Sequence, residues 1–381
     1  MKRLLMLIVL LLAGCNSKQP EAPRDEQPEA SMNEKPEAPL DEQPKALSYL
    51  EKMDLANQIN SSGEMTDEQA ERLSGVDDLY LPGLDSITDE QTKSLSNIGR
   101  LTLSGLTSIT DEQAEILGKV EMLNLNGLPA INDQQAESLS KVEQLYLNEL
   151  TSITDQQAES LSGIDSLSLI GLTSITDQQA ESLSNIRGLL LSGLTSITDS
   201  QAASLSGVNA LYLNGLTSIT DRQAESLGKV EQLNLDGLTS LSDEQAESLS
   251  EVNALYLAGL TSISDQQAAS LSGVNALYLQ GLTSISDQQA ESLGKAKILF
   301  LNGLTSITDQ QAESLGGLST LGLDGLTEIN DEQAESLSKV GSLRLNGLTS
   351  ITDEQAESLS KVKSLLISFD LKALIDKYKK P

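Results

Sequence analysis

The sequence predicts an α/β solenoid, a stack of many copies of one short strand-and-helix unit. Leucines recur at an interval of 22 residues from Leu84 to Leu348, and a period of this size is typical of solenoids. A helix-start motif, Thr, Ser or Asn followed by Asp-x-Gln, recurs at the same interval. Of the 381 residues, 38% are hydrophobic but only 2% are aromatic, which favours many thin aliphatic layers over one thick core.

A representative unit runs from Val208 to Lys229. Leu211 and Leu213 flank Tyr212, an alternation that predicts a short strand with both leucines on one face and the tyrosine on the other. Thr220-Asp221-Arg222-Gln223 fits a capping box and predicts the start of a short helix, with the Asp at the positive end of the helix dipole. The positions expected in the buried stripe are Val208, Leu211, Leu213, Leu216, Ile219, Ala224 and Leu227. Unit starts from Val76 to Val362 give fourteen units.

This pattern resembles the leucine-rich repeat, and is most similar to its cysteine-containing subtype, over residues 63–369. The resemblance implies a horseshoe-shaped solenoid with a parallel sheet on the concave face and short helices on the convex face. The chain departs from the family in having a shorter unit, and Leu216 stands where Cys or Asn is usual, which removes the family's side-chain ladder at that turn. Because terminal units of a stack need covering, we expect cap helices over residues 46–62 and 370–381.

The N-terminus predicts an exported, lipid-anchored protein. Residues 1–14 combine Lys2 and Arg3 with a short apolar run, as in a secretory signal peptide. Leu12-Ala13-Gly14-Cys15 resembles the lipobox of bacterial lipoproteins, which implies lipidation of Cys15, the one cysteine of the chain. Asn16 stands where inner-membrane retention typically uses Asp, so the resemblance implies outer-membrane sorting. Residues 15–45 are acidic and rich in proline, and are expected to form an extended stalk.

Composition excludes several classes of function. The formal net charge of −31 argues against nucleic acid or an anionic membrane surface as partner, so the lipid anchor is the one membrane contact expected. The chain has no His, one Cys and no phosphate-binding or nucleophile motif, so we expect no enzyme activity, no cofactor and no metal site. The recurring Asp of the helix-start motif could suggest stacked calcium sites, but the helix dipole explains it more simply.

The residue between the two strand leucines is the candidate binding position, because it varies while the glutamine of the motif never changes. Neutral drift is the alternative explanation of this variation. Aromatic residues gather at the position, which favours recognition, although tyrosine ladders also stabilise sheets. Equivalent residues should lie about 4.8 Å apart, so Tyr256, Tyr278 and Phe300 should form an exposed strip, extended by Tyr212. The candidate binding residues are Tyr80, Tyr146, Tyr212, Tyr256, Tyr278, Phe300 and Arg344.

The sequence therefore predicts a monomeric, lipid-anchored envelope protein, in the outer membrane, that binds a protein or glycan through its concave face. The alternative is a structural spacer of the envelope that has no specific ligand.

Overall fold

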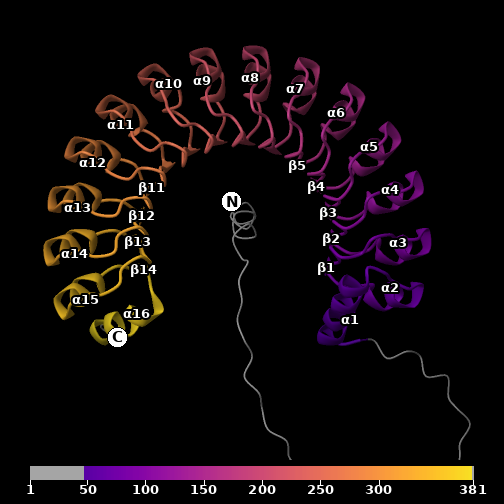
Figure 1. Ribbon diagram of the computed structural model, residues 1–381, viewed down its shortest axis with the longest axis horizontal. Helices are drawn as coiled ribbons and strands as arrows, with labels where there is room; N and C mark the ends of the chain where they lie inside the picture. The colour runs from indigo at the N-terminus through magenta and orange to yellow at the C-terminus, as the bar shows by residue number, and fades with distance from the viewer. Residues whose placement is uncertain (1–46, 380–381) are drawn as a thin grey trace, which may run out of the picture. The chain divides into compact units, whose positions relative to one another are not determined.

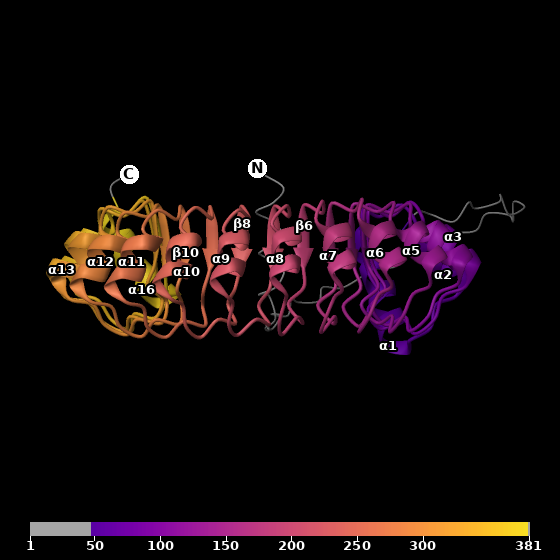
Figure 2. The same cartoon turned by 90° about the horizontal axis from the view of Figure 1, so that it is seen from above.

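The computed structural model describes residues 47–379, which form one repetitive α/β unit. Fourteen parallel strands make a single sheet in chain order, each pairing with the equivalent residues of the next unit. This unit bends into an arc with the sheet on its inner side and the helices on its outer side (Figure 1). Seen from above, helices α5 to α13 stand in one row along the outer side (Figure 2). The predicted fold class and the parallel concave sheet are confirmed.

The bounds of the elements repeat with the 22-residue period. The strands are β1 (Asp78–Tyr80), β2 (Arg100–Thr102), β3 (Met122–Asn124), β4 (Gln144–Tyr146), β5 (Ser166–Ser168), β6 (Gly188–Leu190), β7 (Ala210–Tyr212), β8 (Gln232–Asn234), β9 (Ala254–Tyr256), β10 (Ala276–Tyr278), β11 (Ile298–Phe300), β12 (Thr320–Gly322), β13 (Ser342–Leu345) and β14 (Ser364–Ile367). The helices of the units are α2 (Asp67–Leu73), α3 (Asp89–Leu95), α4 (Asp111–Leu117), α5 (Asp133–Leu139), α6 (Asp155–Leu161), α7 (Asp177–Leu183), α8 (Asp199–Leu205), α9 (Asp221–Leu227), α10 (Asp243–Ser248), α11 (Asp265–Leu271), α12 (Asp287–Leu293), α13 (Asp309–Leu315), α14 (Asp331–Leu337) and α15 (Asp353–Leu359). The terminal helices are α1 (Tyr49–Ser62) and α16 (Phe369–Tyr378).

The core is a continuous stripe of small aliphatic side chains. In the unit of β7, both Leu211 and Leu213 are fully buried, and Ala224 and Leu227 of α9 are as well. The strand covers Ala210–Tyr212, and the Leu213 N–H that follows it still donates to the Asn234 carbonyl of the next unit at 2.9 Å. Leu213 is fully buried directly after the strand, so the predicted inward face is correct.

Every unit helix begins with a complete capping box. The N-cap side chain accepts the backbone N–H of the glutamine, and the glutamine Oε1 accepts the N–H of the N-cap residue. At α9 the two distances are 3.1 Å from the Gln223 nitrogen to Thr220 Oγ1 and 2.9 Å from the Thr220 nitrogen to Gln223 Oε1. Two of the backbone amides at the start of each helix, those of the N-cap residue and the glutamine, are thereby satisfied in helices of six or seven residues.

The same glutamine also bonds to the preceding unit. Its Nε2 donates to a backbone carbonyl 26 residues earlier, as from Gln223 to Ile197 at 2.8 Å. Thirteen successive glutamines, from Gln91 to Gln355, make this bond at 2.6–3.0 Å. Leu216, at the usual position of the family's Cys or Asn, is buried among apolar neighbours. The units are thus joined by a ladder of polar side chains, which the glutamine of the helix-start motif forms and the Leu216 position does not.

The recurring aspartate makes a second ladder. Asp199 Oδ1 accepts a hydrogen bond from Thr220 Oγ1 of the next unit at 2.8 Å. Twelve such bonds join neighbouring units along the outer side. The helix dipole, the only role expected for this Asp from the sequence, is therefore one of two explanations for its recurrence.

The terminal helices cover the two ends unequally. Asn60 of α1 caps the edge of the sheet, since its Nδ2 donates to the Tyr80 carbonyl at 3.0 Å and its Oδ1 accepts the Gly83 N–H at 3.0 Å. Helix α16 packs against α15 and buries Ile375. Helix α1 lies within residues 46–62, and α16 begins at Phe369, one residue before the expected cap of residues 370–381.

The expected signal peptide, the lipidated Cys15 and the expected stalk of residues 15–45 lie outside the described residues. Within residues 47–379, none of the helices has the length and apolar character that crossing a membrane requires.

Candidate binding face

The concave position follows directly from the pairing of the strands. Each strand places one side chain of this column between its two inward leucines, in register with the same position of the next strand. From β1 to β14 the column reads Tyr80, Thr102, Asn124, Tyr146, Ser168, Leu190, Tyr212, Asn234, Tyr256, Tyr278, Phe300, Gly322, Arg344 and Leu366. All the candidate residues named from the sequence, Cys15 apart, therefore lie on one face of the sheet.

Three aromatic rings of this column stack on one another. The ring centroids of Tyr256 and Tyr278 are 4.0 Å apart with an interplanar angle of 9°, and those of Tyr278 and Phe300 are 4.9 Å apart with an angle of 3°. The spacing between neighbouring parallel strands favours this stacking, because it is close to the separation of two stacked aromatic rings. The stack is half-buried, not freely exposed as the sequence suggests, since each ring covers a face of its neighbour.

A glycine shapes the C-terminal end of the stack. Gly322 follows Phe300 in the column, and a Cβ added there would lie 2.3 Å from Phe300 Cδ1, so the ring occupies the space of the missing side chain. Arg344, one strand further, has its guanidinium carbon 5.9 Å from the Phe300 centroid. Its Nη2 pairs with Asp324 Oδ2 at 3.0 Å, while its buried Nε has no hydrogen-bond partner within residues 47–379. The stack thus ends in a cation that sits above an aromatic ring.

The other three tyrosines stand apart from the stack. Asn234 lies between Tyr212 and Tyr256 in the register, so Tyr212 does not join the stacked rings. Tyr146 lies between Asn124 and Ser168. Tyr80, on the first strand, is 65% exposed. The column therefore contains one contiguous aromatic cluster, which we call the ring stack (Tyr256, Tyr278, Phe300), and several single aromatic residues.

The surroundings of three phenols in this column shift their pKa values. Burial raises the pKa of Tyr146, Tyr212 and Tyr256 above the ordinary value, and at Tyr256 the neighbouring Tyr278 raises it further. These hydroxyls remain neutral hydrogen-bond donors throughout the physiological range of pH.

A polar column runs beside the ring stack, just past the inward leucines. Its side chains hold the turns of neighbouring units together: Asp236 Oδ1 accepts the Ala258 N–H at 2.8 Å, and Asp324 Oδ1 accepts the Asn346 N–H at 3.0 Å. Sequence reasoning did not single out these residues, although their recurrence at 22-residue intervals was a signal. Asp236 and Asp324 follow β8 and β12, so these polar contacts lie on either side of the ring stack.

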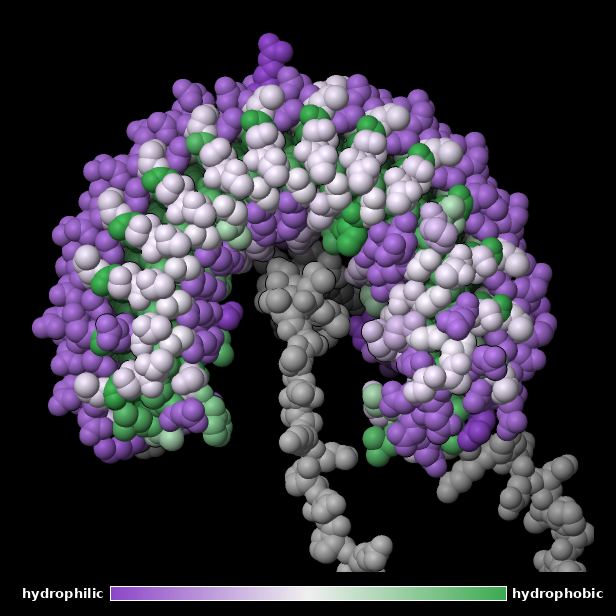
Figure 3. Space-filling view, in the orientation of Figure 1, coloured by the Kyte–Doolittle hydropathy of each residue, from purple (hydrophilic) through white to green (hydrophobic). Residues whose placement is uncertain are grey.

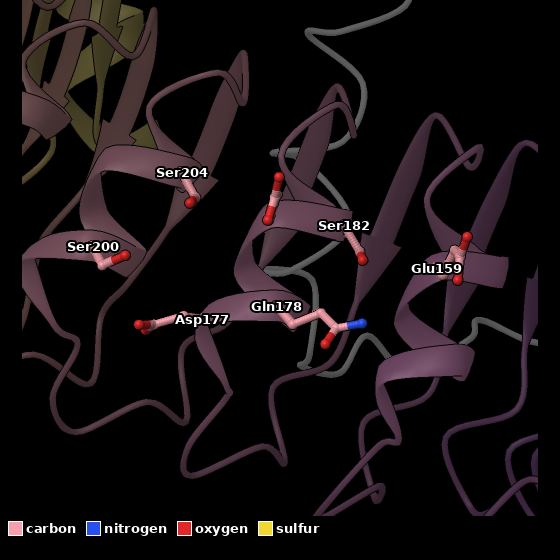
Figure 4. A pocket seen from close by; sticks show the side chains of 7 residues that line it. Glu159, Asp177, Gln178, Ser182, Ser200 and Ser204 are labelled. Atoms are coloured by element: carbon pink, nitrogen blue, oxygen red, sulfur yellow. The ribbon is translucent and has the colours of Figure 1, made fainter.

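The convex side offers a less specific candidate. Glu159, Asp177, Gln178, Glu181, Ser182, Ser200 and Ser204 line a shallow hollow between α6, α7 and α8 (Figure 4). Asp177 is already used, because its Oδ1 accepts a hydrogen bond from Thr198 Oγ1 at 3.1 Å. No group of three or more Asp, Glu, Cys or His side chains within residues 47–379 is arranged to hold a metal ion.

Comparisons with solved structures return leucine-rich-repeat proteins. An internalin, InlF, of Listeria monocytogenes is 18% identical with a TM-score of 0.44, over 86% of this chain and 93% of that one. Toll, in the Drosophila complex of Toll with Spatzle, is 15% identical with a TM-score of 0.48, over 71% of this chain and 41% of that one. The functional domain of InlJ of Listeria monocytogenes, which includes a cysteine ladder, is 13% identical with a TM-score of 0.39, over 78% of this chain and 68% of that one.

No protein-family model matches the sequence, and a search of curated proteins found no match. The fold is that of a leucine-rich-repeat solenoid, and this assignment stands on the fourteen-stranded sheet and its repeating unit.

Proposed function

We propose that this chain is a cell-envelope protein, anchored by a lipid on Cys15 in the outer membrane, that binds a protein partner through its concave face. The observation that carries the proposal is the ring stack, three aromatic side chains in consecutive strands with Arg344 beyond them. Aromatic residues and arginine are the types most enriched in protein recognition surfaces and in their energetic centres. The sheet fixes their positions, so little conformational entropy is lost on binding.

The geometry of the ring stack favours a protein over a glycan. A sugar packs flat against an open aromatic face, but both faces of Tyr278 are covered by Tyr256 and Phe300. The stack instead presents ring edges and hydroxyls. Ring edges carry the positive part of the aromatic quadrupole and attract carbonyl oxygens and the faces of other aromatic rings, which a polypeptide supplies.

The alternative function, a spacer without a ligand, is supported by the same contacts. Stacked aromatic pairs stabilise neighbouring strands, so the rings could be retained for the stability of the sheet alone. The two functions differ in what loss of the rings should change. A spacer would lose stability and no binding, whereas a receptor would lose binding.

The partner class can be tested by capture on the immobilised chain from residue 16 onwards. Polypeptide and polysaccharide fractions of bacterial envelope and host extracts are applied to the wild type and to the variant Tyr256→Ser/Tyr278→Ser/Phe300→Ser. We expect the wild type to retain a polypeptide that the variant does not retain. Retention of a polysaccharide by the wild type alone would contradict the choice of protein over glycan.

Anchoring is tested at Cys15. The thiol of Cys15 is the acyl acceptor of the lipobox-like motif and the one thiol of the chain, so Cys15→Ser should abolish lipid labelling and partitioning into detergent. The measurement is incorporation of a labelled fatty acid during expression in a bacterial host. Partitioning of the variant equal to that of the wild type would refute the lipoprotein assignment.

A further inference from the structure

Large exposed apolar side chains gather at the two ends of the solenoid. Seven large hydrophobic residues are exposed within residues 47–379, and Ile170, at 39%, is the one that lies midway along the units. Figure 3 shows a green group at the end that carries α16 and β14. Large exposed apolar groups on a soluble domain commonly mark a contact surface. The others are Tyr49, Leu50, Met53 and Tyr80 at the N-terminal end and Leu366 and Phe369 at the C-terminal end.

At the N-terminal end the apolar group follows from how α1 sits on the first unit. The helix buries Leu55 and Ile59 in the core of the solenoid. Its first turns leave Tyr49, Leu50 and Met53 exposed to solvent, with Leu50 at 72% exposure. At the C-terminal end of residues 47–379, β14 is the last strand of the sheet and pairs with β13, so no described strand follows to cover Leu366. Phe369, the first residue of α16, is 87% exposed.

The two ends carry opposite charge. Residues 47–85 hold nine carboxylates and two cations, a net charge of −7. Residues 361–379 hold five lysines and two carboxylates, a net charge of +3, in a chain whose net charge is −31. An acidic end with an apolar group and a basic end with an apolar group are complementary to each other, and each repels its own kind.

We propose that these ends form a head-to-tail interface, in which α1 of one copy docks on β14 and α16 of a second copy. The two surfaces are different, so the contact is heterologous, and it extends into a ring or a filament according to the rotation between copies. The interface departs from the monomer expected from the sequence. It is separate from the ring stack, which lies in β9 to β11, although Tyr80 and Leu366 at the two ends belong to the same concave column.

Sedimentation velocity over a concentration series tests the interface. The protein is the chain from residue 16 onwards, which keeps the whole compact unit of residues 47–381 and lacks the lipid site. We expect the sedimentation coefficient to rise with concentration, and to rise less at high salt because the ends attract each other electrostatically. A monomer at all concentrations in low salt would overturn the proposal.

End variants then identify the surfaces. Tyr49→Ser/Leu50→Ser and Leu366→Ser/Phe369→Ser change exposed side chains only, and each should raise the concentration needed for association at least about tenfold. Ile170→Ser is the matched control and should associate as the wild type does. An equal mixture of the two end variants should give a dimer that grows no further, since each copy keeps one intact end.

Other occupants of the ends give different results. If the C-terminal variant alone abolished association, the contact would join two like ends, and the proposal would be wrong. A synthetic peptide of residues 16–46 that bound the chain, and lost binding with Leu366→Ser/Phe369→Ser, would assign that end to the chain's own acidic segment and would overturn the proposal as well.

Discussion

The glutamine of the helix-start motif makes three hydrogen bonds, two through its side chain and one through its backbone N–H. Gln223 bonds to Thr220 twice at the start of α9, and its Nε2 donates to the Ile197 carbonyl of the preceding unit. The Thr220 N–H needs an oxygen acceptor on the side chain, and the Ile197 carbonyl needs an N–H donor on the same side chain, so a neutral amide satisfies both. The uniformity of this position therefore has a structural cause, and the concave column is variable because no such bonds restrict it.

The double role of Gln223 can be separated with Gln223→Glu. The carboxylate keeps the acceptor that caps α9 but cannot donate to Ile197, so unfolding should become easier by about 1–3 kcal/mol at neutral pH. Protonation restores a donor. A carboxyl facing the Ile197 carbonyl should have its pKa raised in the folded state, so the stability of the variant should recover as the pH falls through that raised pKa towards the ordinary Glu value of about 4.3, and should be fully recovered below it.

The measurement is urea unfolding followed by circular dichroism at neutral and acid pH. Glu225→Gln, on the exposed face of the same helix, is the control and should change stability by less than about 0.5 kcal/mol. A Gln223→Glu variant as stable as the wild type at neutral pH would show that the bond between units contributes nothing.

The buried phenol of Tyr256 predicts a loss of stability in alkali. Its pKa is raised in the folded protein. Below the unfolded Tyr pKa of about 10 both the folded and the unfolded chain hold the proton, so this phenol does not lower the free energy of unfolding. Above that pH the unfolded chain releases the proton first, and stability falls. Tyr256→Phe should flatten this fall, and should remove a phenol that ionises late in an ultraviolet alkaline titration. Ionisation of that phenol near pH 10 in the folded wild type would contradict the burial of the ring.

At the scale of the element, no single helix or strand here could persist alone. Unit helices of six or seven residues lie below the length at which an isolated helix is stable, and most of the strands have three residues. Each element is held by leucines from its own unit and from both neighbours, together with the glutamine and aspartate ladders. Stability therefore depends on contacts between units.

The inward leucines should outweigh the caps. Leu213 is fully buried between two neighbours, so Leu213→Ala should cost about 2–5 kcal/mol. Thr220→Ala removes one cap and one bond to Asp199, and should cost about 1 kcal/mol or slightly more. Leu366→Ala, at a half-exposed leucine of the last strand, is the control and should cost much less. Denaturant midpoints would measure all three, and a larger loss for Thr220→Ala would mean that caps dominate the stability.

The sequence was sufficient for the elements and their inward faces because both depend on local spacing. The leucine alternation and the capping box each lie within a few residues, so β7 and α9 could be predicted from Val208–Lys229 alone. The bond from Gln223 to Ile197 could not, because it depends on how closely two units approach. The isolation of Tyr212 was readable from Asn234, whereas the half-burial of the ring stack and the lean of Phe300 over Gly322 depend on three-dimensional contacts.

At the scale of the whole solenoid, fourteen similar units make a long sheet on which the residue between the two inward leucines differs strongly from unit to unit. The ring stack is the place where three neighbouring units of this column act as one surface. Its removal leaves every inward leucine in place, so the solenoid should remain folded while the proposed binding is lost.

The most direct test of the proposed binding face is the affinity of the captured partner for two triple variants. Tyr256→Ser/Tyr278→Ser/Phe300→Ser should weaken binding by about 2 kcal/mol or more, about thirtyfold. Glu225→Lys/Glu247→Lys/Glu291→Lys, on the exposed outer faces of α9, α10 and α12, should leave the affinity unchanged. Weakening by the convex variant and not by the ring-stack variant would contradict the account, and would assign binding to the acidic helices.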